Sequence, residues 1–230
     1  MANRYFVPTL PAVGPCWVDG DLAHHLGRVL RVQAGADVVL GDGIGGTADC
    51  RVIAVAKQRI ELDAIAIRRE LPCHPRILLA FAPPKLQRAE WLFEHGTEVG
   101  VAAFAPLWTE RTRPHGERPE RWQRIIAAAA GQCDRAWIPA LAAAQDLGAF
   151  LQSPDLPAHR VLADALGEPL ATTPAADPVC LLVGPEGGFS AAERQAALAA
   201  GFVPRRFGPH VLRTETAAAI GAALLMANGR

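Results

Sequence analysis

Residues 179–190 read VCLLVGPEGGFS, and residues 207–217 read FGPHVLRTETA. Each stretch runs from a short apolar segment through a turn rich in Gly and Pro toward a helix. Such turns leave backbone amides exposed, and a small ligand can bind to them. A single Gly-rich turn is more typical of an ordinary connector. Two of them in this order and at this spacing predict the opposite walls of one pocket.

The composition indicates a folded protein without metal or disulfide support. The chain has 230 residues, half of them apolar, which is enough for one large domain or two small ones. Five cysteines are scattered at Cys16, Cys50, Cys73, Cys133 and Cys180. They form no Cys-x-x-Cys pair, so neither a metal site nor a disulfide framework is expected. No membrane span and no signal-peptide core are found, which favours a cytoplasmic location.

The charge pattern argues against a whole-surface electrostatic grip on nucleic acid, because the formal net charge is zero. A local basic face stays possible. Lys57 and Lys85 are the only lysines, so nearly every cation is an arginine. Arginine makes forked contacts with phosphate and stacks on bases, but a GC-rich genome explains the bias more simply.

The first part of the chain has the pattern of a small β-barrel. Strands are predicted over 36–40, 47–56 and 59–68, around a cluster of turn residues at 41–46, and a helix is predicted over 21–30. The residues 71–75 read LPCHP and break this pattern. We therefore expect a barrel domain over 1–72 and a second domain over 73–230.

Strands and helices alternate in the second part. Strands are predicted over 76–82, 101–107, 160–164, 179–183 and 202–207, and helices over 86–100, 118–133, 190–201 and 214–228. Ser190 and Glu193 have the spacing of a capping box, and Gly201 is placed to end that helix. Such alternation is typical of an α/β fold with a mostly parallel sheet that is covered on both faces.

These segments resemble the RsmE family of ribosomal small-subunit RNA uridine N3-methyltransferases, which belongs to the SPOUT (trefoil-knot) superfamily. The two turns carry the family signatures as GPEGGFS over 184–190 and LRTETA over 212–217. Further matches are HHLGRVLR over 24–31, TEVGV over 97–101, and AGQCDR over 130–135. The similarity covers almost the whole chain.

The resemblance implies a PUA-like β-barrel that binds RNA, followed by a knotted α/β methyltransferase domain. It also implies S-adenosylmethionine (SAM) as the cofactor, a homodimer, and 16S ribosomal RNA within the small subunit or a precursor as the substrate. No metal and no membrane are implied. The family usually has Arg where this chain has His210, Leu at Phe207, Glu at Gly131 and Lys at His95. A mostly neutral histidine at 210 weakens any grip on an anion or makes it pH-dependent.

The resemblance also implies site residues. For the cofactor they are Leu182, Gly184, Pro185, Glu186, Gly187, Gly188, Phe207, Gly208, Val211, Leu212, Thr216 and Ala217, although Leu182 is equally explained by core packing. The candidates for contact with RNA are Arg28, Arg31, Arg111, Arg113, Arg135 and His210, although a solvated surface position is the simpler interpretation for most of these arginines. Arg213 is the expected clamp on a developing uracil anion. Glu215 is a candidate general base, but an acid that complements the helix dipole is the favoured interpretation of this residue.

Three other functions stay open from the sequence. One is a SPOUT methyltransferase with another base or a ribose hydroxyl as its target. Another is a non-catalytic RNA-binding module, which damaged pocket turns would have favoured. The last is a phosphate-binding hydrolase, which lacks the Gly-Lys-Ser/Thr ending of a nucleotide-binding loop.

Overall fold

The structure, a computed structural model, describes residues 4–112, 118–170 and 178–227. The chain divides into two compact units. The first contains Met1–Pro72 and Ala130–Ile138, and the second contains Cys73–Ala129 and Pro139–Arg230. None of the helices in these described ranges has the length and hydropathy needed to cross a membrane.

The first unit is built on a five-stranded sheet. Its strands are β1 (Arg4–Phe6), β2 (Gly14–Asp19), β3 (Asp37–Gly41), β4 (Gly46–Val55) and β5 (Arg59–Arg69). They lie in the order β1-β3-β4-β5-β2, with β1 parallel to β3 and the other neighbours antiparallel. The helix predicted over 21–30 is divided into α1 (Gly20–His24) and a π-helical turn, η1 (His25–Val29).

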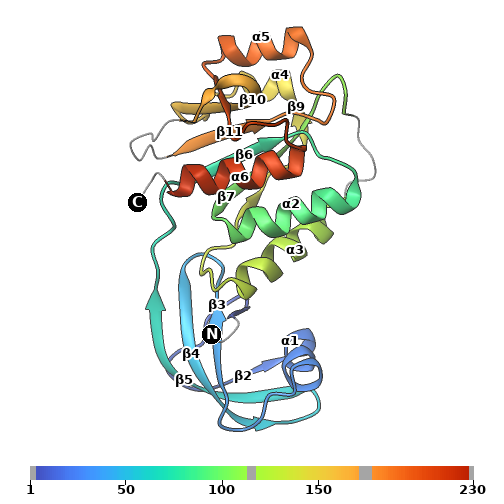
Figure 1. Ribbon diagram of the computed structural model, residues 1–230. Coiled ribbons are helices and arrows are strands. Elements are labelled where there is room, and N and C mark those ends of the chain that lie inside the picture. Colours follow the sequence, from blue (N-terminus) through green and yellow to red (C-terminus); the bar gives the residue numbers. More distant parts are fainter. Residues whose placement is uncertain (1–3, 113–117, 171–177, 228–230) are drawn as a thin grey trace. The chain divides into compact units, whose positions relative to one another are not determined.

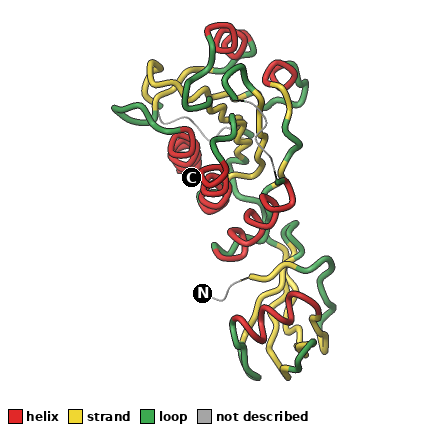
Figure 2. Tube along the Cα trace, turned by 90° about the vertical axis from the view of Figure 1, so that its right-hand side faces the viewer, coloured by secondary structure: helices red, strands yellow, loops and turns green. Residues whose placement is uncertain are grey.

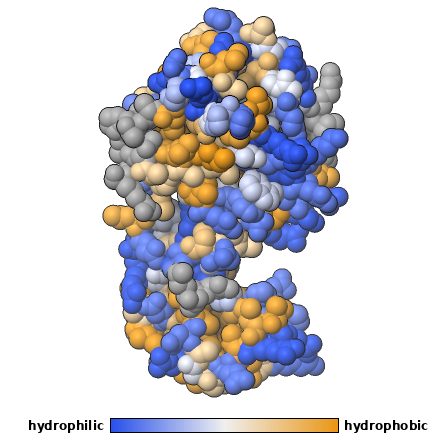
Figure 3. Space-filling view, viewed as in Figure 1, coloured by the Kyte–Doolittle hydropathy of each residue, from blue (hydrophilic) through white to orange (hydrophobic). Residues whose placement is uncertain are grey.

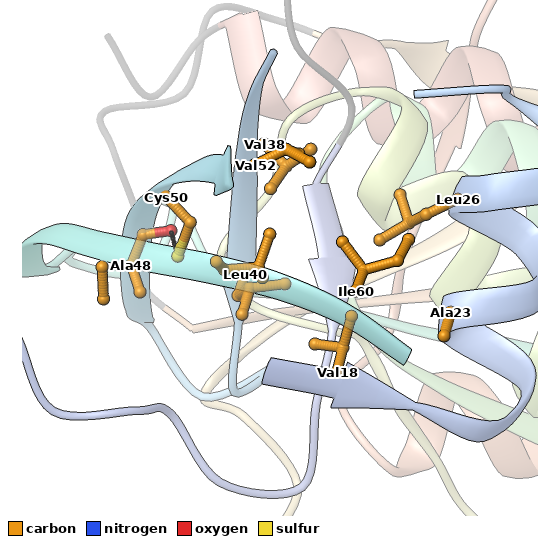
Figure 4. Packing of buried hydrophobic residues seen from close by; sticks show 11 residues of the cluster. Val18, Ala23, Leu26, Val38, Leu40, Ala48, Cys50, Val52 and Ile60 are labelled. Atoms are coloured by element: carbon orange, nitrogen blue, oxygen red, sulfur yellow. Dashed lines mark hydrogen bonds between the residues drawn. The ribbon is translucent and has the colours of Figure 1, made fainter. Parts of the chain in front are cut away.

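Alternation along the strands builds the core of this unit. Ile60 and Leu62 on β5 are buried, whereas Glu61 between them is exposed. Figure 4 shows Ile60 beside Leu26 of η1 and Leu40 of β3, in one cluster of buried side chains. One face of the sheet is therefore covered by the helical segment, as the period-two pattern requires.

A segment from the middle of the chain belongs to the same unit. Buried Arg4 forms ion pairs with Glu70 at 2.9 Å and with Asp134 at 3.0 Å. The indole nitrogen of Trp137 donates to the carbonyl oxygen of Glu70 at 2.9 Å. A Cβ atom on Gly131 would collide with the carbonyl oxygen of Arg4, so glycine at 131 makes room for the β1 backbone.

The second unit alternates strands and helices. Its strands are β6 (Ile77–Phe81), β7 (Val101–Trp108), β8 (Ala140–Leu141), β9 (Gln145–Asp146), β10 (His159–Pro169), β11 (Val179–Val183) and β12 (Val203–Arg206). Its helices are α2 (Leu86–Glu98), α3 (Pro119–Gln132, which continues into the first unit), α4 (Leu147–Leu151), α5 (Ala191–Ala199) and α6 (Thr214–Ala227). The strands lie in the order β12-β10-β11-β6-β7-β8, β9 pairs with β7, and every pairing is parallel.

Helices cover both faces of this sheet (Figures 1 and 2). Buried side chains of α4 and α5 pack with those of β10 and β11 in one cluster, and α6 packs against β6 and β11 on the other face beside α2. The predicted class is confirmed: an α/β domain with a mostly parallel sheet that follows a small β-rich domain. Because β10 lies between β11 and β12, the turns that follow β11 and β12 lie on either side of the end of β10.

Gly221 fixes the distance between α6 and the sheet. A Cβ atom there would lie 2.6 Å from the Phe207 ring and 2.9 Å from a Leu181 methyl group. We predict that Gly221→Ala lowers the free energy of unfolding by about 1–3 kcal/mol, since an added methyl group in a packed core forces side chains to move. Chemical denaturation followed by circular dichroism measures this.

Gly27 provides the matched control for that variant. A Cβ atom on Gly27 would meet Val55 at 3.5 Å, which is ordinary contact. Gly27→Ala is therefore expected to keep the free energy of unfolding within about 1 kcal/mol of that of the original protein. The added methyl group makes only ordinary contacts, and alanine is a better helix former than glycine. Equal stability of the two variants would contradict the close packing inferred at Gly221.

Candidate functional site

The first turn, residues 184–189, connects β11 to α5. The amide of Gly188 donates to the carbonyl oxygen of Pro185 at 2.8 Å. Gly188 has a φ of 71°, a conformation that favours glycine. A Cβ atom on Gly184 would lie 3.0 Å from the Phe189 ring, so that glycine lets the ring pack under the turn. Two glycines therefore shape the first turn: Gly188 by its backbone conformation and Gly184 by the space it leaves for the Phe189 ring.

The capping box predicted at the start of α5 is confirmed, and it ties in a third segment. The Ser190 hydroxyl accepts from the Glu193 amide at 3.2 Å, and the Glu193 carboxylate accepts from the Ser190 amide at 2.8 Å. The same carboxylate accepts from the amide of Glu110 at 2.7 Å, and the Ser190 hydroxyl donates to the Glu110 carboxylate at 2.8 Å. The loop after β7 is thus fastened to the exit of the first turn.

The second turn, residues 207–213, connects β12 to α6. The Thr214 hydroxyl donates to the carbonyl oxygen of Gly184 at 2.9 Å, which joins the start of α6 to the first turn. The first helical hydrogen bond of α6 runs from the Ala217 amide to the carbonyl oxygen of Arg213 at 2.8 Å. The structure therefore brings the two turns together, as the sequence predicts.

The end of β10 forms a further wall, which the sequence analysis misses. The Asp164 carboxylate accepts from the Leu166 amide at 2.9 Å and from Arg194 of α5 at 2.8 Å. β10 extends beyond the predicted 160–164 to Pro169, with an irregular register against β12. Only the order of the strands indicates this wall, because the carboxyl ends of neighbouring parallel strands lie at the same edge of the sheet.

These three walls enclose a cavity of about 390 Å³. Of the predicted residues, those that line it are Gly184, Pro185, Glu186, Gly187, Gly188, Phe207, His210, Val211, Leu212 and Ala217. Lining residues that were not predicted are Leu162, Ala163, Asp164, Ala165, Leu166, Val183, Phe189, Arg194, Arg205, Arg206 and Thr214. The predicted residues Leu182, Gly208, Thr216, Arg213 and Glu215 are not part of the lining. Leu182 is fully buried in the sheet, which agrees with its alternative interpretation as a core residue.

The two candidate catalytic residues lie in different environments. Arg213 is exposed, and its neighbours in the chain, Leu212 and Thr214, both line the cavity. The side chain of Glu215 is 9% exposed, and its Oε1 lies 3.6 Å from Nε of Arg88. Its Oε2 is buried without a hydrogen-bond partner among the residues described. Arg213 is therefore accessible to a substrate, whereas Glu215 is a buried acid balanced by Arg88.

No reactive thiol serves this site among the described residues. Cys180 on β11 is the cysteine nearest in sequence to the first turn, and burial raises the pKa of its thiol to about 12. Burial likewise raises the pKa of Cys50 to about 12 in the first unit. A thiol with such a pKa stays protonated at neutral pH and packs as a small apolar group. Covalent catalysis by cysteine therefore has no support here.

The arginines predicted to bind RNA are distributed over both units. Arg28 and Arg31 are exposed in the first unit, and Arg135 lies half-buried in the segment that returns to it. Arg111 lies in the second unit, where its guanidinium donates to the carbonyl oxygen of Gly187. Arg113 lies outside the described residues. In the ranges that are described, no group of three His, Cys, Asp or Glu side chains is arranged to hold a metal ion.

The walls of the cavity fit a cofactor that carries an adenine, a ribose and an amino acid. The volume lies within the usual range for small-molecule sites, about 300–1,000 Å³. Exposed turn backbone offers hydrogen bonds to a purine edge, and Val183, Phe189 and Leu212 offer apolar contact. Acidic and basic side chains line the same cavity, including Asp164 and Arg205, and suit the two charges of an amino acid.

Comparison with known proteins agrees with this geometry. The family described as an RNA methyltransferase domain matches residues 69–226, and the RNA methyltransferase PUA domain matches residues 18–65. The ribosomal RNA small subunit methyltransferase E of Synechocystis is 35% identical over 89% of this chain and 70% of its own length. The protein of the same name from Mycobacterium tuberculosis is 33% identical over 96% of this chain and 89% of its own length.

Solved structures give the same result. A ribosomal RNA small subunit methyltransferase E from Neisseria gonorrhoeae, bound to SAM, superposes with a TM-score of 0.88 at 27% identity, over 97% of this chain and 96% of that one. A methyltransferase from Legionella pneumophila in complex with SAM superposes with a TM-score of 0.87 at 29% identity, over 99% and 98% of the two chains. The protein is thus a member of the ribosomal RNA small subunit methyltransferase E family, RNA methyltransferases that use SAM as their cofactor.

Proposed function

We propose that this protein methylates N3 of a uridine in 16S ribosomal RNA, within the small ribosomal subunit or a precursor of it. The observation that carries the proposal is the closure of the two signature turns around one cavity, joined by the hydrogen bond between Thr214 and Gly184. The names of the relatives support small-subunit ribosomal RNA as the substrate. The position N3 follows from the resemblance of the sequence motifs.

In this proposal the cavity holds SAM between the first and second turns. The turn backbone would bind the adenine, with Leu212 and Ala217 against its faces. When bound, SAM supplies a methyl group on a sulfonium, a built-in leaving group that needs no covalent help from the protein. The contribution of the chain is then to orient the reactants and to exclude water from the methyl group.

Arg213 would act on the uracil. N3 carries a proton and lies on the pairing edge, so the target base must be unpaired when it reaches the site. That proton is released to solvent, and the negative charge left behind is shared between N3 and the two carbonyl oxygens of the ring. The exposed guanidinium of Arg213 at the edge of the cavity would hold this charge. Glu215 is buried beside Arg88, which favours its alternative interpretation as an acid that stabilises the start of α6.

The basic residues outside the cavity would position the RNA. The candidates for contacts with phosphate are Arg28 and Arg31 in the PUA-like domain, Arg135 in the segment that returns to it, and Arg113 in the second domain. Such contacts fix a substrate without selecting its sequence. His210 lines the cavity and stays a candidate contact for RNA. The domain limits of 1–72 and 73–230 belong to the same proposal, as does an action on ribosomes in the cytoplasm.

A homodimer is the proposed assembly, with α6 at the interface. Figure 3 shows apolar side chains on the surface over α6, and Leu224 of that helix is 39% exposed. Helix α6 is apolar around most of its circumference, a property of helices that are covered on all sides. Sedimentation equilibrium is expected to give twice the chain mass of 24.4 kDa. A mass of one chain at micromolar concentration would rule out the dimer.

The function is tested on ribosomal subunits from a strain that lacks the protein. Small subunits are incubated with the protein and labelled SAM, the RNA is digested, and the modified nucleoside is identified by mass spectrometry. Methyl on N3 of one uridine is the expected product. Methyl on a ribose hydroxyl or on another base would replace the proposed target, and RNA binding without methyl transfer would indicate a non-catalytic module.

A further inference from the structure

The first turn needs support from outside itself. Glu186, Gly187 and Gly188 are all exposed, although they form one wall of the cavity. A short turn whose middle residues are exposed opens more easily than packed structure, and a ligand that binds to it must then order it. Two arginines from distant parts of the chain contact these three residues.

Arg111 holds the turn from the side of β7. Its Nη1 donates to the carbonyl oxygen of Gly187 and lies 3.5 Å from that of Gly188. The base of Arg111 is itself fixed, because Thr109 and Thr112 on either side of it exchange backbone hydrogen bonds of 3.4 Å and 3.2 Å. A guanidinium on a fixed loop therefore binds the two carbonyl groups of the turn.

Arg88 holds the turn from the side of α2. Its Nη1 lies 3.4 Å from Oε1 of Glu186, and its Nε lies 3.6 Å from Oε1 of Glu215. Glu186 belongs to the first turn, and Glu215 lies in the first helical turn of α6, directly after the second turn. Arg88 therefore links the carboxylate of one cavity wall to the helix that carries the other wall.

We propose that Arg88 and Arg111 are positioning residues, which hold the first turn in the shape that binds SAM. The proposal rests on the proposed location of SAM in this cavity. It assigns Arg111 to the cofactor site in place of the contact with RNA that the sequence predicts. Neither arginine touches the reacting atoms, so their removal should act on cofactor affinity and leave the chemical step largely unchanged.

The test measures SAM binding by calorimetry, without RNA, and then steady-state kinetics on small subunits. Arg111→Ala and Arg88→Ala are each expected to raise the dissociation constant and the KM for SAM by about fivefold to tenfold, the effect of losing one solvent-exposed hydrogen bond. At saturating SAM, kcat and the KM for the subunits should stay within about twofold of the original. Arg111→Lys should recover part of the affinity, because it keeps one charged donor.

Arg121→Ala is the matched control. Arg121 is an exposed arginine on α3 whose guanidinium pairs with Glu90 of α2 at 2.8 Å, away from the cavity. Its removal eliminates a surface ion pair of the same kind as that of Arg88, and SAM affinity should not change. Melting temperatures of all variants show whether each one is folded.

Three results would overturn the proposal. If SAM affinity is unchanged in both arginine variants and the KM for the subunits rises, Arg111 contacts the RNA, as the sequence predicts. A fall in kcat at saturating SAM without a change in affinity would make either residue part of the chemistry. Unchanged SAM affinity in Gly184→Val, a variant of the first turn itself, would place the cofactor elsewhere, and the proposed site would then fail together with the two arginines.

Discussion

Replacing Arg213 with alanine is expected to lower kcat about a hundredfold and to leave the affinity for SAM unchanged. Removing one donor that stabilises transition-state charge typically costs about a hundredfold to a thousandfold in rate. Arg213 is exposed between the two lining residues Leu212 and Thr214, and it is not part of the cavity wall itself. Loss of Arg213 should therefore slow the reaction of the uracil without weakening the binding of SAM. Single-turnover methylation of small subunits measures the rate, and calorimetry measures the affinity.

Two companion variants make this result specific. Arg213→Lys keeps the charge without the forked donors and should recover part of the rate. Arg124→Ala removes another exposed arginine, whose side chain donates to the carbonyl oxygen of Glu120 within α3. This variant should change neither the methylation rate nor the affinity for SAM. Full activity of Arg213→Ala would remove Arg213 from the mechanism. A parallel loss of SAM affinity would instead make it a cofactor contact.

Replacing Gly184 with valine is expected to weaken SAM binding about tenfold to a hundredfold. The first atom of the new side chain would lie 3.0 Å from the Phe189 ring, which packs beneath the first turn and lines the cavity. Displacing the ring costs about 1–3 kcal/mol, and each 1.4 kcal/mol that acts on the bound form is a tenfold change in affinity. The carbonyl oxygen of Gly184 also accepts the hydrogen bond from Thr214, so a shift of the turn loosens the second wall as well.

Calorimetry with Gly184→Val, Gly184→Ala and Gly27→Ala separates this effect from a general loss of stability. Alanine at 184 should weaken binding less than valine does, because it adds only the Cβ atom. Alanine at 27 makes ordinary contact in the first unit and should bind SAM as the original protein does. Wild-type affinity in Gly184→Val would mean that SAM does not depend on the first turn.

Local features of the sequence predict local structure well in this chain. The capping box at Ser190 and the end of α5 before Gly201, whose φ is 81°, both follow from short-range hydrogen bonding and backbone freedom. The helix over 21–30 was predicted as one α-helix, and the structure changes to a π-helical turn at His25. A hydrophobic pattern over ten residues does not distinguish these two forms.

Features that depend on distant residues could not be predicted in the same way. Strand β10 continues to Pro169 because Arg205 and Arg206 of β12 pair with its far end, and the isolated segment gives no sign of this. The short elements β8, β9 and α4 are likewise absent from the predicted pattern. The strand order places β10 between the two turns, which is why its end forms a wall that the motifs do not reveal.

The sequence predicts those parts of the candidate site that consist of turn backbone. The first turn (184–189) and the second turn (207–213) contain their own Gly and Pro residues, so the sequence identifies them directly. The contact of Arg111 with Gly187 joins residues 76 positions apart, and that of Arg88 with Glu186 joins residues 98 apart. No periodicity or spacing reports such pairs, and only the folded structure shows which arginines support the turn.

A crystal structure of the protein with SAM would show where the cofactor binds. We expect SAM in the cavity between the two turns, with its adenine against the turn backbone and its methyl group directed toward the side of Arg213. Density for SAM at any other place on the chain, with this cavity left empty, would contradict this expectation.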